Sequence, residues 1–351
     1  MQALTVIKCG SDTRMEPLIK SFDGETSVKV ISPDGFFLNG HKAEPLLFMV
    51  SVDALGMDED FIKLIRGIRS MGEGLFGCTA GVIMLGSTEL DTKDAARRLI
   101  FALDMAGCAF CERPLVEATG SMRNLRTIKR TQELGSYMDA LIFSAAGLVK
   151  RLSAYTPVRF DKPRLLVLHA SDRPTSNTLA LGDLVLDALD ESFTVSTMSL
   201  RNGTIEDCRG CAYKVCSHFA SKGSCFYGGS ISQEVLPAVR NCDALMLLLP
   251  NYNDAVGANV MAFINRLTGL HVSGGLSGQR LFAVAVSGYS GGDIVAMQAM
   301  GALCLNKAFV LPPFFCLMET ANDPGEAVSL PGIKERAALF ASRIEREMLS
   351  K

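Results

Sequence analysis

A polar segment that could bind an anion follows an apolar run near the middle of the chain. Residues 164–182 read RLLVLHASDRPTSNTLALG, which predicts a strand, then a loop of hydroxyl and amide side chains, then a helix. In that order, hydroxyls and backbone N–H groups converge on an anion at the positive end of a helix. Neither the G-x-G-x-x-G of dinucleotide sites nor the Gly-Lys-Ser/Thr of triphosphate sites is present. We therefore expect a single terminal phosphate to be bound here by Ser171, Arg173, Ser176, Asn177 and Thr178, although an ordinary capped helix would show the same pattern.

Two further loops with the composition of a ligand site follow apolar runs downstream. After ALMLLL the chain reads PNYNDAVG from Pro250, and after LFAVAV it reads SGYSGGD from Ser287. Each loop alone could be a turn, but loops that follow parallel strands meet at one sheet edge. Backbone amides and the Tyr252 ring suit a flat heterocycle, and glycines let main chain lie close to it. We expect the ring to be lined by Pro250, Asn251, Tyr252, Asn253, Asp254, Ala255, Ser287, Gly288, Tyr289, Gly291 and Gly292. A phosphate loop beside two such loops predicts flavin mononucleotide (FMN).

These motifs resemble those of the NAD(P)H-dependent FMN reductase family. SDRPTSNT from Ser171 resembles the family's Ser-x-Arg-x-x-Ser-x-Thr phosphate loop, PNYND from Pro250 its Pro-Glu-Tyr-Asn flavin-edge motif, and SGYSGG from Ser287 its glycine-rich ring loop. The similarity covers roughly residues 164–318. Asn251 replaces the family's usual acidic residue and Asp254 a small one.

The resemblance implies a flavodoxin-like fold and a particular reaction. Hydride would pass from NADH or NADPH, as a transient co-substrate, to bound FMN, and electrons would then reach a flavin, a quinone, an aromatic nitro or azo compound, or a protein. No protein acid or base is needed for the first half-reaction, because the cofactor carries the chemistry, so we predict no catalytic side chain. The alternatives are a non-catalytic electron carrier or a cysteine-based redox sensor, and a scaffold without flavin.

Four cysteines fall within eighteen residues in a segment that we expect to be a loop. They are Cys208, Cys211, Cys216 and Cys225. The first pair has the Cys-x-x-Cys spacing that lets two thiolates reach one metal ion. The position of the segment resembles that of the cysteine motif in the iron–sulfur flavoproteins related to this family, but the later spacings are looser. Three hypotheses stay open: a [4Fe–4S] cluster, a structural zinc or unoccupied thiols, and a reversible thiol–disulfide pair.

Six further cysteines and the one histidine of this segment receive simpler interpretations. We interpret His218 as a solvated loop residue. Small buried hydrophobic side chains are expected at Cys78, Cys108, Cys111, Cys242, Cys304 and Cys316.

The chain carries the same pattern twice. Residues 5–14, 45–68 and 81–114 parallel residues 165–173, 244–267 and 282–313, and each copy ends in a charged helical pattern, at 124–152 and 333–349. Alternating apolar strands and helices predict an α/β fold of two flavodoxin-like, doubly wound parallel-sheet domains from an internal duplication. Two unrelated α/β domains are the alternative. We place the domains at 1–155 and 156–351, joined by a linker at 150–163 that contains two prolines.

The first copy lacks the features that suit a ligand. After Ser11-Asp12 it has no Ser-Asn-Thr cluster and a shortened helix, it has Ser51-Val52-Asp53-Ala54 where the second copy has PNYND, and it lacks the cysteine segment. We therefore expect a degenerate domain without cofactor, one FMN per chain, and an internal pseudo-dimer in which the first domain is the permanent partner of the second. Further homo-oligomerisation stays open.

Composition excludes several classes of partner. A formal net charge of −2 and a pI near 6.1 do not indicate the excess positive charge that binds nucleic acid or an anionic membrane. No apolar run reaches the roughly 18 residues of a transmembrane helix, and the N-terminal residues do not resemble a signal peptide. Eleven scattered cysteines in a chain of 351 residues predict a reduced, cytoplasmic setting.

Overall fold

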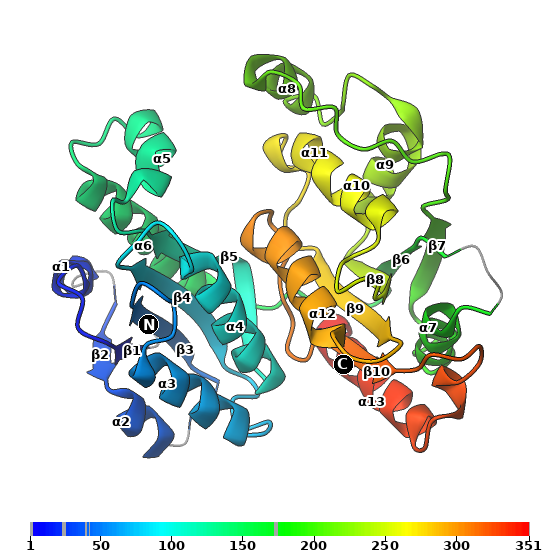
Figure 1. Ribbon diagram of the computed structural model, residues 1–351, viewed down its shortest axis with the longest axis horizontal. Coiled ribbons are helices and arrows are strands. Elements are labelled where there is room, and N and C mark those ends of the chain that lie inside the picture. Colours follow the sequence, from blue (N-terminus) through cyan, green and yellow to red (C-terminus); the bar gives the residue numbers. More distant parts are fainter. Residues whose placement is uncertain (1–2, 23–25, 39–40, 42, 172–174, 351) are drawn as a thin grey trace. The chain divides into compact units, whose positions relative to one another are not determined.

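The computed structural model describes residues 3–22, 26–38, 41, 43–171 and 175–350. The chain divides into two compact units, residues 1–156 (unit 1) and residues 157–351 (unit 2) (Figure 1). The division lies one residue from the boundary expected from the sequence.

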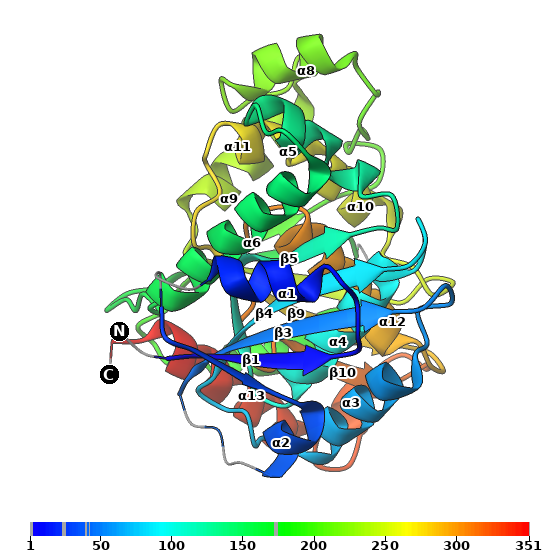
Figure 2. The same ribbon diagram turned by 90° about the vertical axis from the view of Figure 1, so that its left-hand side faces the viewer.

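Unit 1 is a parallel sheet with helices on both faces. Its sheet has five strands in the order β2-β1-β3-β4-β5, and every pairing is parallel. Figure 2 shows α1 and α6 on one side of the sheet and α2 and α3 on the other. The elements are β1 (Leu4–Cys9), α1 (Met15–Ser21), β2 (Val28–Ile31), α2 (Pro33–Leu38), β3 (Pro45–Val52), α3 (Glu59–Ser70), β4 (Thr79–Gly86), α4 (Thr92–Met105), β5 (Ala109–Ala118), η1 (Arg123–Leu125), α5 (Arg126–Thr131) and α6 (Tyr137–Ala154).

Unit 2 repeats this arrangement with additions. Its five strands have the order β10-β9-β8-β6-β7 and are also all parallel. The elements are β6 (Arg164–His169), α7 (Asn177–Asp187), β7 (Thr194–Ser199), α8 (Tyr213–Ala220), η2 (Ile231–Val235), α9 (Leu236–Asn241), β8 (Ala244–Pro250), α10 (Ala258–Arg266), α11 (Thr268–Val272), β9 (Arg280–Ser287), α12 (Gly292–Met300), η3 (Gly301–Leu305), β10 (Cys316–Thr320), η4 (Ala327–Ser329) and α13 (Ile333–Met348).

The two units share one topology. Within each unit the second strand in sequence lies at one edge, followed across the sheet by the first, third, fourth and fifth. This is the doubly wound order of the flavodoxin-like fold, with a switch point beside the first strand. The predicted fold class is therefore confirmed, and the shared strand order is consistent with the predicted duplication.

The central strands explain the long apolar runs of the sequence. β3, β8 and β9 are buried along almost their whole length. A parallel sheet covered on both faces has no polar side, so its strands are continuous apolar runs rather than alternating ones. In unit 2, side chains of α7 and α13 pack with the strands in one core cluster, and α1 and α6 do the same in unit 1.

Two predicted segments differ from the structure. The charged pattern at 124–152 is not one helix, because η1 and α5 end before a break at 132–136, and Ser136 then begins α6 with a capping box to Asp139. The predicted linker also starts too early, since α6 continues to Ala154. A capping box is a strong local start signal, and it fixes the start of the last helix of unit 1.

None of the helices in the described ranges is long and apolar enough to cross a membrane.

Candidate functional site

The predicted loops of unit 2 meet at one cavity at the carboxyl edge of the sheet. The cavity has a volume of about 640 Å³. Loops that follow β6, β8, β9 and β10 line it. The predicted residues among the lining are Ser171, Ser176, Asn177, Thr178, Pro250, Asn251, Tyr252, Asn253, Asp254, Ser287, Gly288 and Tyr289. Three others, Ala255, Gly291 and Gly292, are described by the structure but lie outside this lining, and Arg173 falls outside the described residues.

The N-terminus of α7 lies at the wall of the cavity. Ser176 is the N-cap residue, and its hydroxyl oxygen accepts a hydrogen bond from the backbone N–H of Leu179 at 3.3 Å. Thr178 is 3% exposed and lines the cavity. N–H groups of a first helical turn have no carbonyl partner within the helix, and the helix dipole adds positive potential there. This end of α7 therefore offers hydroxyl and N–H donors to an anion.

The side chain of Asn177, which lines the cavity, also binds another part of the chain. Its Nδ2 donates to the carbonyl oxygen of Asp323 at 2.8 Å, and its Oδ1 accepts from the backbone N–H of Ala327 at 3.2 Å. Both ends of the amide therefore bind the loop that follows β10. Asn177 positions a wall of the cavity.

The loop after β8 is a tight hairpin. Tyr252 and Ala255 exchange two backbone hydrogen bonds, of 3.3 and 3.1 Å. Between them, Asn253 and Asp254 adopt left-handed conformations, with φ of 54° and 56°. Two successive residues with positive φ characterise the type I′ turn, which favours Asn and Asp because their short side chains tolerate this region. The sequence Asn-Asp thus explains the shape of this loop, and Tyr252 is left 60% exposed at the cavity.

Asn251 joins this hairpin to the loop after β9. Its Nδ2 donates to Asp254 Oδ1 at 3.2 Å, to Ser287 Oγ at 3.0 Å and to the carbonyl oxygen of Ser290 at 2.9 Å. Its Oδ1 is buried and has no hydrogen-bond partner in the described part of the chain. An ionised carboxylate at this position could not donate these bonds.

The glycines of the third loop differ in how much room their surroundings leave for a side chain. Gly291 has φ of +86°, and a Cβ there would collide with Asp254 Oδ1 and lie 2.9 Å from Asn251 Nδ2. A Cβ at Gly288 would lie 3.0 Å from Asn322 Oδ1, whereas Gly292 would make only ordinary contact. Gly291 therefore makes room for the neighbouring hairpin of the chain itself.

Sequence reasoning missed several residues of the site. Thr175 and Asn322 line the cavity, and Gln298 on α12 supports the hairpin by donating to the carbonyl oxygen of Asp254 at 2.9 Å and accepting from Val256 N–H at 3.0 Å. Asn322 follows the end of β10 closely, so the rule that found the other loops could have found it. Nothing in the sequence marks Gln298, because it acts from a neighbouring helix.

The four cysteines of unit 2 surround a second, smaller cavity. Cys208, Cys211, Cys216 and Cys225 all line a space of about 50 Å³, together with Phe219, Phe226 and Arg266. Burial raises the pKa of the Cys216 thiol, and the neighbouring Cys211, Cys208 and Cys225 raise it further. Across the described ranges, no three His, Cys, Asp or Glu side chains are arranged as the ligands of one metal ion.

The segment itself is not the loop that the sequence predicts. α8 forms between the second and fourth cysteines, and Figure 1 shows it beyond α11 at one end of unit 2. His218 is exposed, but it lies on α8. All eleven cysteines are free thiols. The six cysteines predicted to be small core residues are buried, which confirms that prediction for Cys78, Cys108, Cys111, Cys242, Cys304 and Cys316.

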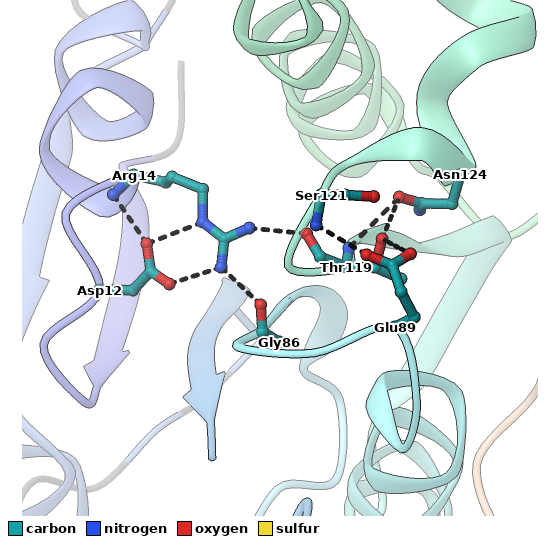
Figure 3. Close-up of polar contacts among 7 residues, drawn as sticks. All are labelled: Asp12, Arg14, Gly86, Glu89, Thr119, Ser121 and Asn124. Atoms are coloured by element: carbon teal, nitrogen blue, oxygen red, sulfur yellow. Dashed lines mark hydrogen bonds and ion pairs between the residues drawn. The ribbon is translucent and has the colours of Figure 1, made fainter. Parts of the chain in front are cut away.

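At the same edge of unit 1, side chains of the chain itself join the loops (Figure 3). Arg14, next to α1, binds Asp12 through two hydrogen bonds, Nε to Oδ1 at 2.9 Å and Nη2 to Oδ2 at 2.6 Å. The same guanidinium donates to the carbonyl oxygens of Thr119 at 2.9 Å and Gly86 at 2.8 Å. One side chain thus joins the segments that follow β1 and β5 to the end of β4.

Electrostatics hold this group of contacts together. The Arg14 and Asp12 side chains are only 14% and 18% exposed. Burial raises the pKa of Asp12, but the hydrogen bonds and charge of Arg14 outweigh it and hold the pKa below its usual value. Nearby, Glu89 accepts from Ser121 N–H at 2.8 Å and from Thr119 Oγ1 at 2.9 Å (Figure 3).

Comparison with known protein families matches unit 2. The family model described as NADPH-dependent FMN reductase matches residues 163–323. The predicted resemblance is therefore confirmed for this part of the chain, and it supports a flavin-dependent oxidoreductase. No curated protein matches the chain.

Solved structures with a similar arrangement each cover about half of the chain. An FMN-dependent NADH-azoreductase from Bacillus anthracis str. Ames Ancestor, in complex with FMN, is 12% identical, with 52% of this chain and 99% of that chain covered and a TM-score of 0.36. An NAD(P)H:quinone oxidoreductase from Methanothermobacter marburgensis is 14% identical, with coverages of 53% and 95% and a TM-score of 0.39. The Trp repressor binding protein from Bacillus subtilis is 14% identical, with coverages of 51% and 98% and a TM-score of 0.35.

Proposed function

We propose that the chain is an FMN-dependent oxidoreductase that accepts hydride from NADH or NADPH and passes electrons to a second substrate. The observation that carries the proposal is the cavity of unit 2, where a helix N-terminus and the loops that follow β6, β8, β9 and β10 converge. The family match to residues 163–323 supports it. When bound, FMN supplies the hydride and electron chemistry, so the protein's task is to position it.

Different residues around the cavity would bind the phosphate and the ring of FMN. The hydroxyls of Ser171, Thr175, Ser176 and Thr178, with the N-terminus of α7, would hold the phosphate. No described residue of the lining is Lys or Arg, so neutral donors carry this part of the site unless Arg173 joins them. The hairpin and the loop after β9 would bind the polar edge and one face of the ring.

The exposed aromatic side chains suggest where the second substrate binds. Tyr289 is 84% exposed and Tyr252 60% exposed, and both line the cavity. Flat aromatic surfaces at the mouth of a site favour planar partners such as a nicotinamide, a quinone or an azo compound. We propose that the acceptor belongs to this class of small planar molecules.

A spectroscopic titration tests the proposed function. The protein should bind one FMN per chain, and NADH or NADPH should bleach the flavin band rapidly without oxygen. Absence of flavin binding would refute the proposal, and a bound flavin that neither nucleotide reduces would leave an electron carrier instead.

A single substitution tests the proposed phosphate site. Thr178→Val should weaken FMN binding about tenfold, because a hydrogen bond to a charged group is lost. Riboflavin, which lacks the phosphate, should bind the variant and the parent equally. The control is Thr197→Val at an exposed position of β7. Equal losses for FMN and riboflavin would contradict the phosphate assignment.

For the four-cysteine cavity we propose a [4Fe–4S] cluster, which when bound supplies one-electron transfer. The donor type fits, because four thiols line one small cavity, but within the described ranges they are not arranged as the ligands of one metal ion, so a cluster would have to draw them together. Analysis of iron, sulfide and zinc in protein purified without oxygen tests this assignment. Zinc without sulfide would indicate a structural metal, and neither metal nor sulfide would indicate a thiol–disulfide pair and favour the redox-sensor function.

A further inference from the structure

One residue gives the cavity of unit 2 its charge. Among the described residues that line this cavity, Asp254 has the only charged side chain. It is exposed, and its carboxylate accepts a hydrogen bond from the neutral amide of Asn251 at 3.2 Å. No Lys, Arg or His within the described ranges forms an ion pair with it. The described part of the cavity therefore carries a negative charge that no ion pair neutralises.

Contacts within the chain hold this carboxylate beside the loop after β9. Asp254 is the second left-handed residue of the hairpin, with φ of 56°, and its carbonyl oxygen accepts from Gln298 Nε2 at 2.9 Å. Because a Cβ at Gly291 would collide with Asp254 Oδ1, the carboxylate lies directly against that loop. The fold thus fixes the position of the charge.

The same two loops carry the tyrosines of the proposed acceptor site. Tyr252 precedes Asp254 by two residues on the hairpin, and Tyr289 precedes Gly291 by two residues on the loop after β9. A planar acceptor that contacts these rings has Asp254 as the only charged residue of the described lining. Like charges about 4 Å apart in water weaken binding by about fivefold, opposite charges strengthen it equally, and both effects grow where water is excluded.

We propose that Asp254 is a specificity-determining residue, which selects neutral or cationic planar acceptors over anionic ones. The inference rests on the proposed function and deepens it by naming the charge of the acceptor. In the overall reaction, the hydride of NADH or NADPH and one proton from solvent convert a quinone into its hydroquinone. Asp254 takes no part in that transfer and acts only through its charge, on the approach and binding of the acceptor.

Three acceptors that share one ring system test the inference. They are naphthoquinones whose quinone-ring carbons are methylated, so that they do not alkylate thiols, and whose benzene ring carries no further group, a sulfonate or a trimethylammonium group. Asp254→Asn removes the charge, keeps an oxygen that can accept from Asn251, and places a residue that tolerates the left-handed region. Asp187→Asn is the control, because it removes the same charge from an exposed position at the last residue of α7, roughly 15 Å along the helix from its first.

Two measurements on the full-length, FMN-loaded proteins report the effect. Quenching of the flavin fluorescence gives the affinity of each quinone for the oxidised protein, in which no electron transfer takes place. Stopped-flow reoxidation, after reduction by NADH, gives the rate constant for each quinone. Comparing each variant with the parent cancels the differences in solubility and reduction potential between the quinones.

We expect Asp254→Asn to bind the sulfonate about fivefold more tightly and the trimethylammonium quinone about fivefold more weakly than the parent does, each relative to the neutral quinone. The reoxidation rates should change in the same directions, and the control should match the parent. The differences should shrink in about 1 M salt, where the screening length is about 3 Å.

Unchanged ratios in Asp254→Asn would overturn the inference and leave the proposed function standing. An equal change for all three quinones, as a distorted hairpin would give, would do the same. A parent that binds no flavin, or whose bound flavin neither nucleotide reduces, would refute the proposed function and remove the inference with it.

Discussion

The carboxyl edges of the two sheets differ in what lies between their loops. In unit 2 the loops surround a cavity of about 640 Å³, and their own contacts, centred on Asn251, run along its wall. In unit 1 the guanidinium of Arg14 reaches Asp12, Gly86 and Thr119 and joins the corresponding segments. The two units therefore share a topology but differ at this edge. The loops of unit 2 leave a cavity between them, whereas those of unit 1 are joined by side-chain contacts.

One pair of matching positions shows that the backbone of the two units can agree locally although the residues differ. Asp91 and Gly291 precede the helices α4 and α12, which follow the fourth strand of each unit, and both are left-handed, with φ of 67° and 86°. In unit 1 the side chain of Asp91 is accommodated because its neighbour is Gly56, where a Cβ would lie 2.8 Å from Asp91 Cβ. Both units thus have a left-handed residue before this helix, with the glycine at that position in unit 2 and in the neighbouring loop in unit 1.

The largest expected effect concerns the arginine of unit 1. Arg14→Met removes the hydrogen bonds to two carbonyl oxygens and leaves the Asp12 carboxylate mostly buried without its partner. We expect unit 1 to lose about 3 kcal/mol of stability, measured as faster hydrogen exchange in its central strands. Arg98→Met, at a solvent-exposed pair with Asp94, is the control and should cost less than about 0.5 kcal/mol. Equal effects would show that the contacts at this edge do not stabilise unit 1.

In unit 2 the matching test is the glycine that precedes α12. Gly291→Ala places a Cβ against Asp254 and strains a left-handed residue, so the hairpin must shift. We expect a cost of about 2 kcal/mol, or roughly thirtyfold weaker FMN binding, by fluorescence titration. Gly203→Ala is the control, because Gly203 has a similar φ of +81° but open space around it. If both variants bind FMN as the parent does, the shape of this loop does not matter for the ligand.

Acid should act on unit 1 through Asp12. The pKa of its carboxyl is held low in the fold because Arg14 outweighs burial, and the unfolded value is about 3.9. Between these two values the unfolded chain binds more protons, so stability rises with pH in that window. The contribution is complete above the unfolded value and is lost as pH falls through the folded one. Asp12→Asn should flatten this part of the acid dependence in hydrogen exchange, and a slope equal to that of the parent would contradict the assignment.

Much of this comparison could be predicted from the sequence. Strands buried on both faces read as apolar runs, and a polar loop after such a run lies at the carboxyl edge of a parallel sheet. That rule placed the loops at Ser171, Pro250 and Ser287 around one cavity. It also located the differences in unit 1, where the Ser-Asn-Thr cluster and the PNYND sequence have no counterpart.

The rest depends on contacts between distant parts of the chain. Arg14 reaches residues that follow it by 72 and 105 positions, and no local pattern encodes such a pairing. The same holds for Arg266, which donates to carbonyl oxygens at the two ends of the cysteine segment, 38 and 60 positions before it. The Cys-x-x-Cys spacing could be recognised in the sequence. The helix α8, which forms between the second and fourth cysteines, could not.

A substitution of Asn177 distinguishes a residue that binds the phosphate from one that anchors a loop of the cavity. A phosphate ligand and a loop anchor both weaken FMN binding when removed, but they differ toward riboflavin, which has no phosphate. Because the amide of Asn177 binds Asp323 and Ala327, Asn177→Ala should weaken FMN and riboflavin alike, by about tenfold, the value of two modest hydrogen bonds. Thr178→Val, which we expect to affect FMN alone, is the reference. A loss confined to FMN would return Asn177 to the phosphate site and show that the ligand draws its side chain away from the loop after β10.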